Sequence, residues 1–201
     1  MIVRRLGLVA YEPAWRAMQS FTSARLEATD DQIWLVEHPS VFTLGLAGRR
    51  EHVLDPGGIP VIATDRGGQV TYHGPGQALA YVLADLRRLG IGSRELVRRL
   101  EQSAIDVLAA YGVAGERRAG MPGVYVGGAK IAAIGLRIAR GCSYHGMALN
   151  VDLDLAPFDR IDPCGYPGLA STRLADLGVR DSMDIVQKKM ADCLLRCLTP
   201  T

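Results

Sequence analysis

Residues 66–77 read Arg-Gly-Gly-Gln-Val-Thr-Tyr-His-Gly-Pro-Gly-Gln, and the rest of the chain is organised around this glycine-rich block. The block holds four glycines and only two large apolar side chains. Gly67 and Gly68 permit positive φ angles and let the backbone approach another group closely, and residues 74–76 favour a turn. This composition predicts a polar loop, because neither a periodic strand nor a helix needs it.

Apolar runs flank the block, at residues 61–63 before it and 78–83 after it, and each predicts a buried strand. A polar loop between two buried strands is a common place for a binding site. The block can also be interpreted as a long hairpin turn with a structural arginine. That interpretation leaves unexplained why one loop collects the side chains of Arg66, Tyr72, His73 and Gln77.

The overall composition indicates one domain, residues 1–201, with no preference for nucleic acid or membranes. Hydrophobic residues make up 48% of the chain, which is enough for a sizeable core. The net charge is 23 − 21 = +2, which is too small to indicate nucleic-acid binding. No run of about 18 uncharged apolar residues predicts a membrane span. The N-terminus lacks a signal-peptide pattern, so we expect a cytoplasmic protein.

Basic residues often occur in adjacent pairs. Such pairs are either solvated surface or a docking site for an acidic partner, since complementary charge mainly raises association rates. The pairs lie at residues 4–5, 49–50, 87–88, 98–99 and 117–118.

The four cysteines form no CxxC pair, so we expect no zinc or other metal site. In a reducing cytosol disulfides are rare. Each cysteine is then either a small core residue or a reactive thiol. The four are Cys142, Cys164, Cys193 and Cys197.

Apolar periodicity predicts an α+β fold, with a mixed sheet and flanking helices. A first helix has Pro13 in its first turn, a second is capped by Ser93 and ends at Gly112, and a third covers about 182–198. Long loops are expected at 46–58 and 152–172. Strands are expected at 2–9, 33–37, 41–44, 60–64, 77–86, 123–126, 130–139 and 142–151, with hairpin turns at 127–128 and 140–141.

Cys164 lies in a loop with two prolines and two glycines, outside any apolar period. Gly165 lets a substrate carbonyl approach closely and leaves backbone N–H groups free to bind an oxyanion. From the residues alone, Cys164 is either a nucleophile or a structural loop cysteine. The other three cysteines follow strand or helix faces, as core residues do.

Lys130 is one of only three lysines, and it opens the almost uncharged segment 127–135. A lysine among alanines and isoleucines is either an exposed strand end or a desolvated functional amine. As a neighbour of a cysteine, such an amine would favour the reactive thiolate. Lys188 and Lys189 lie on the polar side of the last expected helix.

Histidine is the competing candidate for a base. His38 precedes Pro39 and is interpreted as structural, and His52 is expected to be exposed. His73 lies in the glycine-rich block, where we expect it to position substrate or to donate to an oxyanion. His145 is expected to support other site residues through hydrogen bonds.

Four motifs together resemble the octanoyltransferases of lipoate biosynthesis. They are RGGxxTYHGPGQ at 66–77, GxKIxxxG at 128–135, HGxALN at 145–150 and PCG at 163–165. The resemblance extends from about residue 38 to residue 173. Ala133 stands where the family often has serine, and Met147 where it usually has leucine or isoleucine.

The resemblance implies the fold of the biotin/lipoyl protein ligase catalytic domain, with a smaller lobe. It also implies that Cys164 is the acyl acceptor and that Lys130 pairs with it. The implied acyl-binding residues are Arg66, Gly67, Gly68, Gln69, Val70, Thr71, Tyr72, His73, Ala133, Ile134, Gly135, Gly146, Met147 and Ala148.

The implied reaction moves an octanoyl group from octanoyl acyl carrier protein to a lysine through a cysteine thioester. The acceptors are lipoyl domains of 2-oxoacid dehydrogenases and the glycine-cleavage carrier protein. No cofactor is expected, because the thioester is already activated, and we expect a monomer. Two alternatives remain open from the residues: an ATP-dependent lipoate or biotin ligase of the same fold, and a non-catalytic module that binds an acyl carrier.

Overall fold

The computed structural model describes residues 1–162 and 168–199. These residues form a seven-stranded sheet of order β1-β2-β6-β10-β9-β8-β7 and a three-stranded sheet of order β4-β3-β5. Strand β1 is parallel to β2 and β3 is parallel to β4, whereas the other pairs are antiparallel. The strands are β1 Ile2–Leu8, β2 Gln32–Glu37, β3 Val41–Leu44, β4 Val61–Ala63, β5 Val70–His73, β6 Gln77–Leu83, β7 Glu116–Arg118, β8 Met121–Val126, β9 Ala129–Ala139 and β10 Cys142–Asn150.

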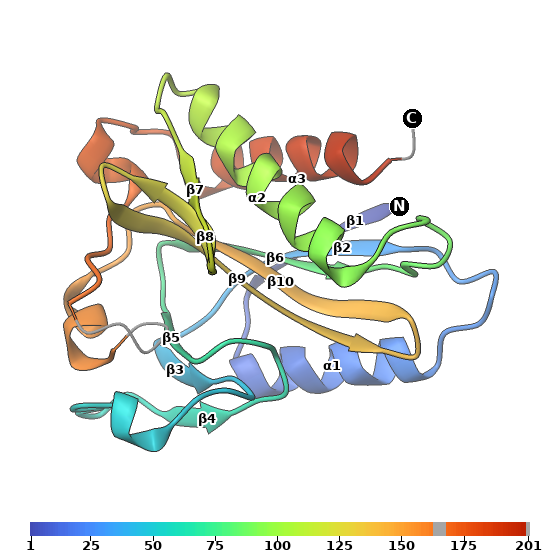
Figure 1. Ribbon diagram of the computed structural model, residues 1–201, viewed down its shortest axis with the longest axis horizontal. Helices are drawn as coiled ribbons and strands as arrows, with labels where there is room; N and C mark the ends of the chain where they lie inside the picture. The colour runs from blue at the N-terminus through green and yellow to red at the C-terminus, as the bar shows by residue number, and fades with distance from the viewer. Residues whose placement is uncertain (163–167, 200–201) are drawn as a thin grey trace.

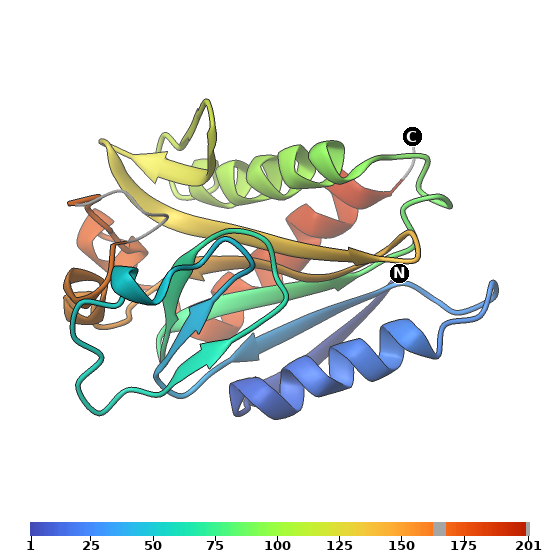
Figure 2. The ribbon, with the colours of Figure 1, turned by 60° about the horizontal axis from the view of Figure 1, so that its bottom comes forward.

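Helices cover both faces of the large sheet (Figure 1). Helix α1 (Tyr11–Ser23) packs on one face, and helices α2 (Ser93–Ala109) and α3 (Met183–Leu198) pack on the other. The small sheet lies on the same side as α1, which Figure 2 shows from a second direction. Short 3₁₀ turns occupy Arg50–His52, Ala156–Arg160 and Leu174–Leu177. The α+β class with a mixed sheet and a smaller lobe is therefore confirmed.

Strand β6 explains how one sheet serves two cores. All seven of its residues are buried. Successive side chains of a strand point to opposite faces, and each face of β6 packs in a core. Ala78, Ala80 and Val82 contact the core under α2 and α3. Leu79, Tyr81 and Leu83 belong to the second core, under α1.

The structure corrects the interpretation of the glycine-rich block as a loop throughout. Val70–His73 pairs with β3 as strand β5, with Tyr72 opposite Phe42. Val70 and Tyr72 are buried in a third core with Phe42 and Phe158. Two large apolar side chains at a spacing of two therefore sufficed to make a short strand.

Ser93 is the first residue of α2 and makes no capping bond, since the N-cap is Gly92, which corrects the expected cap. Helix α1 begins at Tyr11, so Pro13 lies in its first turn, as expected. Strand β7 was not predicted, because its three residues are polar and it exists by pairing with β8. Of the helices described, none is both long and apolar enough to span a lipid bilayer.

Candidate active site

A cleft of about 790 Å³, which includes the part open to solvent, collects most of the predicted binding residues. Its size suits a small-molecule ligand. Lys130 lies on its wall, together with Tyr11, Leu79, Tyr81 and His145, which the acyl-binding prediction did not include. The predicted positions on the wall are Arg66, Gly68, Gln69, Val70, Thr71, His73, Ala133, Ile134, Gly135, Gly146, Met147 and Ala148.

Two predicted positions lie away from the cleft wall. The Gly67 N–H donates to the carbonyl of Leu136, at 2.8 Å, and so ties the glycine-rich block to β9. Tyr72 packs in the core of the small lobe, and its hydroxyl is 2.9 Å from that of Ser40. Both residues therefore hold the block in place, and neither lines the cleft.

One wall of the cleft consists of strand residues with small side chains. Ala133 of β9 pairs with Ala148 of β10, and Gly135 pairs with Gly146. Because these residues carry one side-chain carbon or none, they leave room in front of the sheet. Leu79 of β6, which pairs with Ala148, adds a large apolar side chain.

Arg66 holds the opposite wall. Its buried guanidinium donates to the hydroxyl and carbonyl of Thr43 and to the carbonyls of Gly67 and Gln69, at 2.7–3.1 Å. A Cβ at Gly45 would lie 2.4 Å from the carbonyl oxygen of Gly68, so only glycine allows this approach. Arg66 therefore fixes the backbone conformation of residues 66–69 beside the cleft.

Lys130 is a buried amine and not an exposed strand end. The residue is 7% exposed, and Nζ donates to the carbonyl of Pro122 at 3.2 Å. Nζ also lies 5.3 Å from the centre of the Tyr125 ring, and Tyr125 of β8 pairs with Lys130 in the sheet. A cation near an aromatic face is stabilised electrostatically, which offsets part of the cost of burial.

Cys164 lies outside the described residues, and its role as acyl acceptor stays a prediction. Backbone hydrogen bonds tie the described chain before and after residues 163–167 to the rest of the fold. The Asp162 N–H donates to the carbonyl of His52 at 2.9 Å. The Lys130 N–H donates to the carbonyl of Ala170 at 2.8 Å, and the Thr172 N–H donates to the Lys130 carbonyl at 3.0 Å.

His73 is held as a neutral ring. The amide nitrogen of Gln77 donates to the Oδ1 of Asn150 at 2.9 Å, so its oxygen faces the Nδ1 of His73, at 2.7 Å. Nδ1 therefore carries the proton, and Nε2 is an acceptor. Burial, together with nearby His38, lowers the pKa of His73 to about 3. A neutral ring with this tautomer argues against His73 as an oxyanion donor through Nε2.

Asp65 collects the polar groups near the other histidine of the cleft, and sequence reasoning missed it. Its carboxylate accepts from the Nε2 of His145 at 2.9 Å and from the hydroxyl of Tyr144. Trp15 and Gln19 of α1 also donate to it, at 2.8 and 3.0 Å. Burial raises the pKa of Asp65, but the hydrogen bonds outweigh burial and hold this pKa below its usual range. Asp65 thereby fixes the ring of His145, and the support of other site residues by His145 stays a prediction.

His38 is structural, as predicted. Its Nδ1 donates to the carbonyl of Val9 at 2.5 Å, so its Nε2 accepts from the hydroxyl of Tyr81, also at 2.5 Å. Burial lowers the pKa of His38 to about 4. His52 is half-buried, which corrects the expectation that it is exposed.

The other cysteines occupy packed positions. Cys142 and Cys193 are buried on a strand and a helix, and Cys197 is partly buried. Within residues 1–162 and 168–199, no group of three or more potential metal-ligating side chains comes together.

Comparisons with known proteins agree with this architecture. Residues 10–194 match the lipoyl protein ligase A/B catalytic domain family. An octanoyltransferase of Thiobacillus denitrificans is 60% identical over 98% of this chain and 91% of its own length. One of Aromatoleum aromaticum is 58% identical over 100% of this chain and 87% of its own length.

Solved structures share the fold at low sequence identity. A lipoate-protein ligase A bound with ATP has a TM-score of 0.77 at 16% identity, covering 98% of this chain and 86% of that one. The biotin protein ligase of Aquifex aeolicus has a TM-score of 0.59 at 11% identity, covering 98% and 69%. These two structures show the fold alone. The family match and the two octanoyltransferases also show the family of the chain. The chain belongs to the octanoyltransferases, within the lipoyl protein ligase A/B catalytic domain family.

Proposed function

We propose that this chain moves an octanoyl group from octanoyl acyl carrier protein to a lysine of a lipoyl domain, through a thioester on Cys164. In the first half, the Cys164 thiolate attacks the carbonyl carbon of the donor thioester. The carbon–sulfur bond to the carrier breaks, and the carrier thiol leaves with a proton. The ammonium of Lys130 favours the Cys164 thiolate and supplies that proton.

In the second half, the ε-amine of the acceptor lysine attacks the acyl-enzyme. An amide bond forms, the bond to Cys164 sulfur breaks, and the attacking nitrogen loses a proton to the neutral amine of Lys130. Both halves use the same sulfur and the same amine, so one site serves both carriers. The acceptors are the lipoyl domains of 2-oxoacid dehydrogenases and the glycine-cleavage carrier protein.

The observation that carries this proposal is the buried amine of Lys130 on the wall of a mostly apolar cleft. An octanoyl chain has six CH₂ groups, and burying each contributes about 0.8 kcal/mol, or about 5 kcal/mol for the chain. The walls that would receive it are Ala133–Gly135 and Gly146–Ala148. We further propose that residues 1–201 act as one catalytic domain, as a monomer in the cytoplasm.

Intact-mass measurement after mixing with octanoyl acyl carrier protein tests the proposal. Wild type should gain the mass of one octanoyl group, and Cys164→Ser should gain none while keeping its fold. Cys142→Ser should acylate as wild type does, since Cys142 is a packed core residue. A wild-type protein without the adduct would favour a module that only binds the carrier. Acylation of a lipoyl domain from octanoate and ATP would instead favour a ligase.

Lys130→Arg tests the proton transfers separately from the charge. Arginine keeps a positive charge but does not lose a proton under ordinary conditions, and its planar group is larger. We expect transfer to fall by about a hundredfold or more, the usual size of a general acid–base contribution. Single-turnover transfer to a lipoyl domain measures this, and a rate near that of wild type would exclude Lys130 as the proton carrier.

A further inference from the structure

Glu101 is a buried carboxylate that the proposed reaction does not use. It projects from α2, and its side chain is 8% exposed. Oε1 accepts the backbone N–H of Gly123 at 3.1 Å, and Oε2 accepts from the Nε of Arg117 at 3.1 Å. Burying a carboxylate is costly unless it is paired, so these two bonds explain how it is tolerated. They do not explain why a carboxylate stands at this position.

The explanation lies in the peptide unit between Pro122 and Gly123. In a trans peptide the C=O and the N–H point in opposite directions. Glu101 holds the N–H of this unit, and the carbonyl oxygen on its other side accepts the hydrogen bond from the Nζ of Lys130 at 3.2 Å. One rigid peptide therefore connects the carboxylate to the amine.

Packing around this peptide leaves little freedom for the lysine. Gly123 has a φ of 131°, and a Cβ there would lie 3.2 Å from the Cε of Lys130 and 2.6 Å from the carbonyl oxygen of Ala132. The Tyr125 ring lies near Nζ, and its hydroxyl donates to the carbonyl of Met121 at 3.2 Å. Strand β8 thus contacts the lysine through Gly123, Tyr125 and the Pro122 carbonyl.

We infer that Glu101 is a positioning residue for the transfer reaction, acting on the Nζ of Lys130 through the Pro122–Gly123 peptide. The inference rests on the function proposed above, in which Lys130 carries the protons. An N–H bound by a carboxylate also polarises its own carbonyl, which strengthens the bond that this carbonyl accepts. Arg117 balances the charge of Glu101 from the solvent side.

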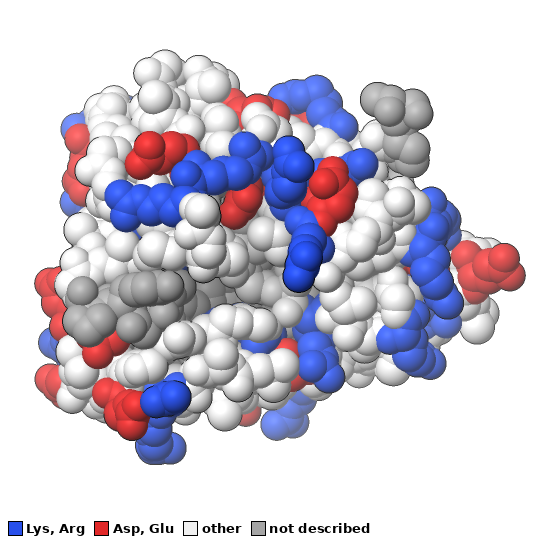
Figure 3. Space-filling view, viewed as in Figure 1, with Lys and Arg blue, Asp and Glu red and all other residues white. Residues whose placement is uncertain are grey.

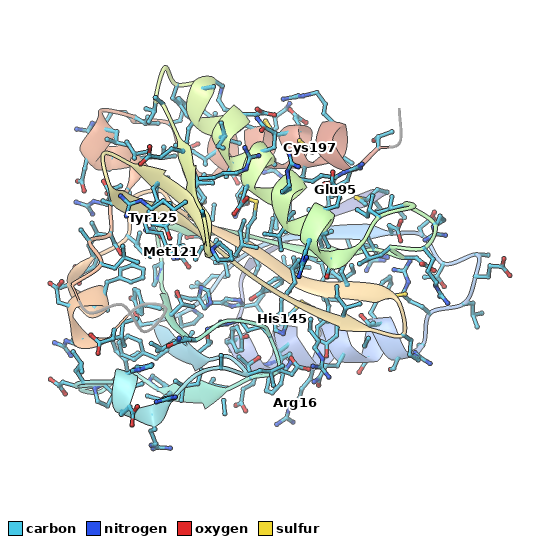
Figure 4. All side chains as sticks on the ribbon, in the orientation of Figure 1. Arg16, Glu95, Met121, Tyr125, His145 and Cys197 are labelled. Carbon is cyan, nitrogen blue, oxygen red and sulfur yellow. The ribbon has the colours of Figure 1, made fainter. Side chains whose placement is uncertain are left out.

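The test compares Glu101→Ala with Glu101→Gln and with the control Glu95→Gln. Glutamine keeps an oxygen that can accept the Gly123 N–H, whereas alanine leaves this donor without its partner. Glu95 lies on the same helix, but its side chain is 44% exposed and pairs with Arg99 one turn away. Figure 4 labels Glu95 near the start of α2, away from Tyr125 and Met121.

Steady-state transfer is the first measurement. For Glu101→Ala, kcat should fall about tenfold, as expected for one lost charge-assisted hydrogen bond. KM for octanoyl acyl carrier protein should stay within about twofold, because the lysine acts in the chemical step. Glu101→Gln and Glu95→Gln should keep kcat within about threefold of wild type. A purely structural role would lower the melting temperature and leave kcat per folded enzyme unchanged.

Lysine labelling is the second measurement, and it does not depend on Cys164. Brief treatment with isotopically marked acetic anhydride, followed by peptide mass spectrometry, reports the reactivity of each amine. The exposed Lys188 serves as an internal reference. In Glu101→Ala the ratio of Lys130 to Lys188 labelling should rise by about threefold or more. The Pro122 carbonyl, which accepts the hydrogen bond from the amine, is then no longer held in place by Glu101. In the glutamine variant the ratio should match wild type.

Both changes are required, so a wild-type kcat or a wild-type labelling ratio in Glu101→Ala would overturn the inference. If wild type forms no octanoyl adduct, the proposed function fails, and the labelling ratio still decides whether Glu101 positions Lys130. If Glu101→Ala is unfolded at the assay temperature, Glu101→Asp replaces it. Aspartate keeps the charge beside Arg117 but withdraws the oxygen from Gly123 by one methylene, and the same two changes are expected.

Discussion

Small side chains create the space that a linear acyl chain needs in front of the sheet. Ala148 is buried between Leu79 of β6 and Ala133 of β9, and it faces the cleft. A larger residue at this position would occupy the cleft itself, because the neighbouring strands leave no lateral room. Ala148 is therefore the position where cleft depth can be changed without touching Lys130.

Replacing Ala148 with phenylalanine should shorten the preferred acyl chain. We expect transfer from octanoyl and dodecanoyl donors to fall more than transfer from a butanoyl donor, since each excluded CH₂ forfeits about 0.8 kcal/mol. Alkylation of Cys164 by a small reagent should be unaffected. The measurement is kcat/KM for the three donors on both proteins, and an unchanged ranking would place the acyl chain elsewhere.

Lys130 and His73, which motifs singled out, both lie on the cleft wall, and their roles in the reaction stay predictions. Asp65 was not singled out, because its partners Trp15, Gln19, Tyr144 and His145 lie 46 to 80 positions away in the chain. Only tertiary structure brings these donors together. The tautomer of His73 likewise follows from Gln77 and Asn150, whose contact spans 73 positions.

Strand β10 depends on a glycine where it crosses between β6 and β9. A Cβ on Gly146 would lie 2.0 Å from the carbonyl oxygen of Ala80, which is backbone and cannot move aside cheaply. The preceding residue, His145, has a φ of 61°, which few residues other than glycine adopt. The hydrogen bond to Asp65 and the stacking on Tyr144 help to hold His145 in this conformation.

Gly146→Ala should therefore destabilise the protein by about 2 kcal/mol or more, as overpacking in a core does. Gly58→Ala is the matched control, because a Cβ at Gly58 meets no atom within 4 Å and its φ lies outside the left-handed region. That change should stay within about 0.5 kcal/mol. Urea unfolding of the two variants and wild type measures the difference. Equal stabilities would mean that β10 shifts to accommodate the methyl group.

Elements were predictable where apolar periodicity is long. Strand β9 and the last helix begin and end close to the expected residues. Strand β5 has four residues and forms by pairing with β3. Strand β7 has three residues and forms by pairing with β8. Such short strands have no local signal of sufficient length, because their stability comes from hydrogen bonds to distant segments.

At the scale of the whole molecule, three buried histidines couple folding to pH. Burial lowers the pKa of His38 to about 4, lowers that of His73 to about 3, and also lowers that of His145. The unfolded chain binds protons at these rings below about pH 6.5, and the folded chain does not. Stability is then complete above pH 6.5 and is lost progressively as the pH falls toward 4.

Between pH 7 and pH 5, His38 and His73 should each remove up to about 2 kcal/mol from the free energy of unfolding. Urea unfolding at the two pH values measures the loss. His73→Asn should show a smaller loss of unfolding free energy than wild type, because it removes one of the imidazole rings whose pKa is lowered in the folded protein. Equal stability of wild type at both pH values would mean that these histidines titrate normally in the folded protein.

The fold class was predictable from sequence, but the order of the strands was not. The hairpin of β9 and β10 was expected, but β10 also pairs with β6, and β1 runs parallel to its neighbour β2. The β6–β10 and β1–β2 pairings join segments that are distant in the chain, so no local pattern encodes them. The cleft between the two sheets depends on the same pairings.

The family resemblance implies carriers that are small acidic domains, and charge on the outer surface suggests how such a carrier reaches the cleft. A band of Lys and Arg side chains crosses the face formed by α2 and β7, above a hollow in the surface (Figure 3). Arg94 and Arg98 of α2 and Arg117 of β7 are exposed. Because the net charge is only +2, this band reflects local arrangement and not overall charge. Local fields of this kind mainly raise association rates.

We therefore expect kcat/KM for octanoyl acyl carrier protein to fall as salt is raised, because the screening length shrinks from about 8 Å at 0.15 M to about 3 Å at 1 M. A small octanoyl thioester, which lacks the acidic carrier, should show little dependence on salt.

The double change Arg94→Glu and Arg98→Glu should lower kcat/KM for the carrier donor and leave kcat unchanged. Arg16→Glu is the control, since this arginine is 76% exposed on α1, away from the band (Figure 4). If Arg16→Glu weakened the carrier reaction as much as the double change, docking would depend on overall charge and not on the α2–β7 face.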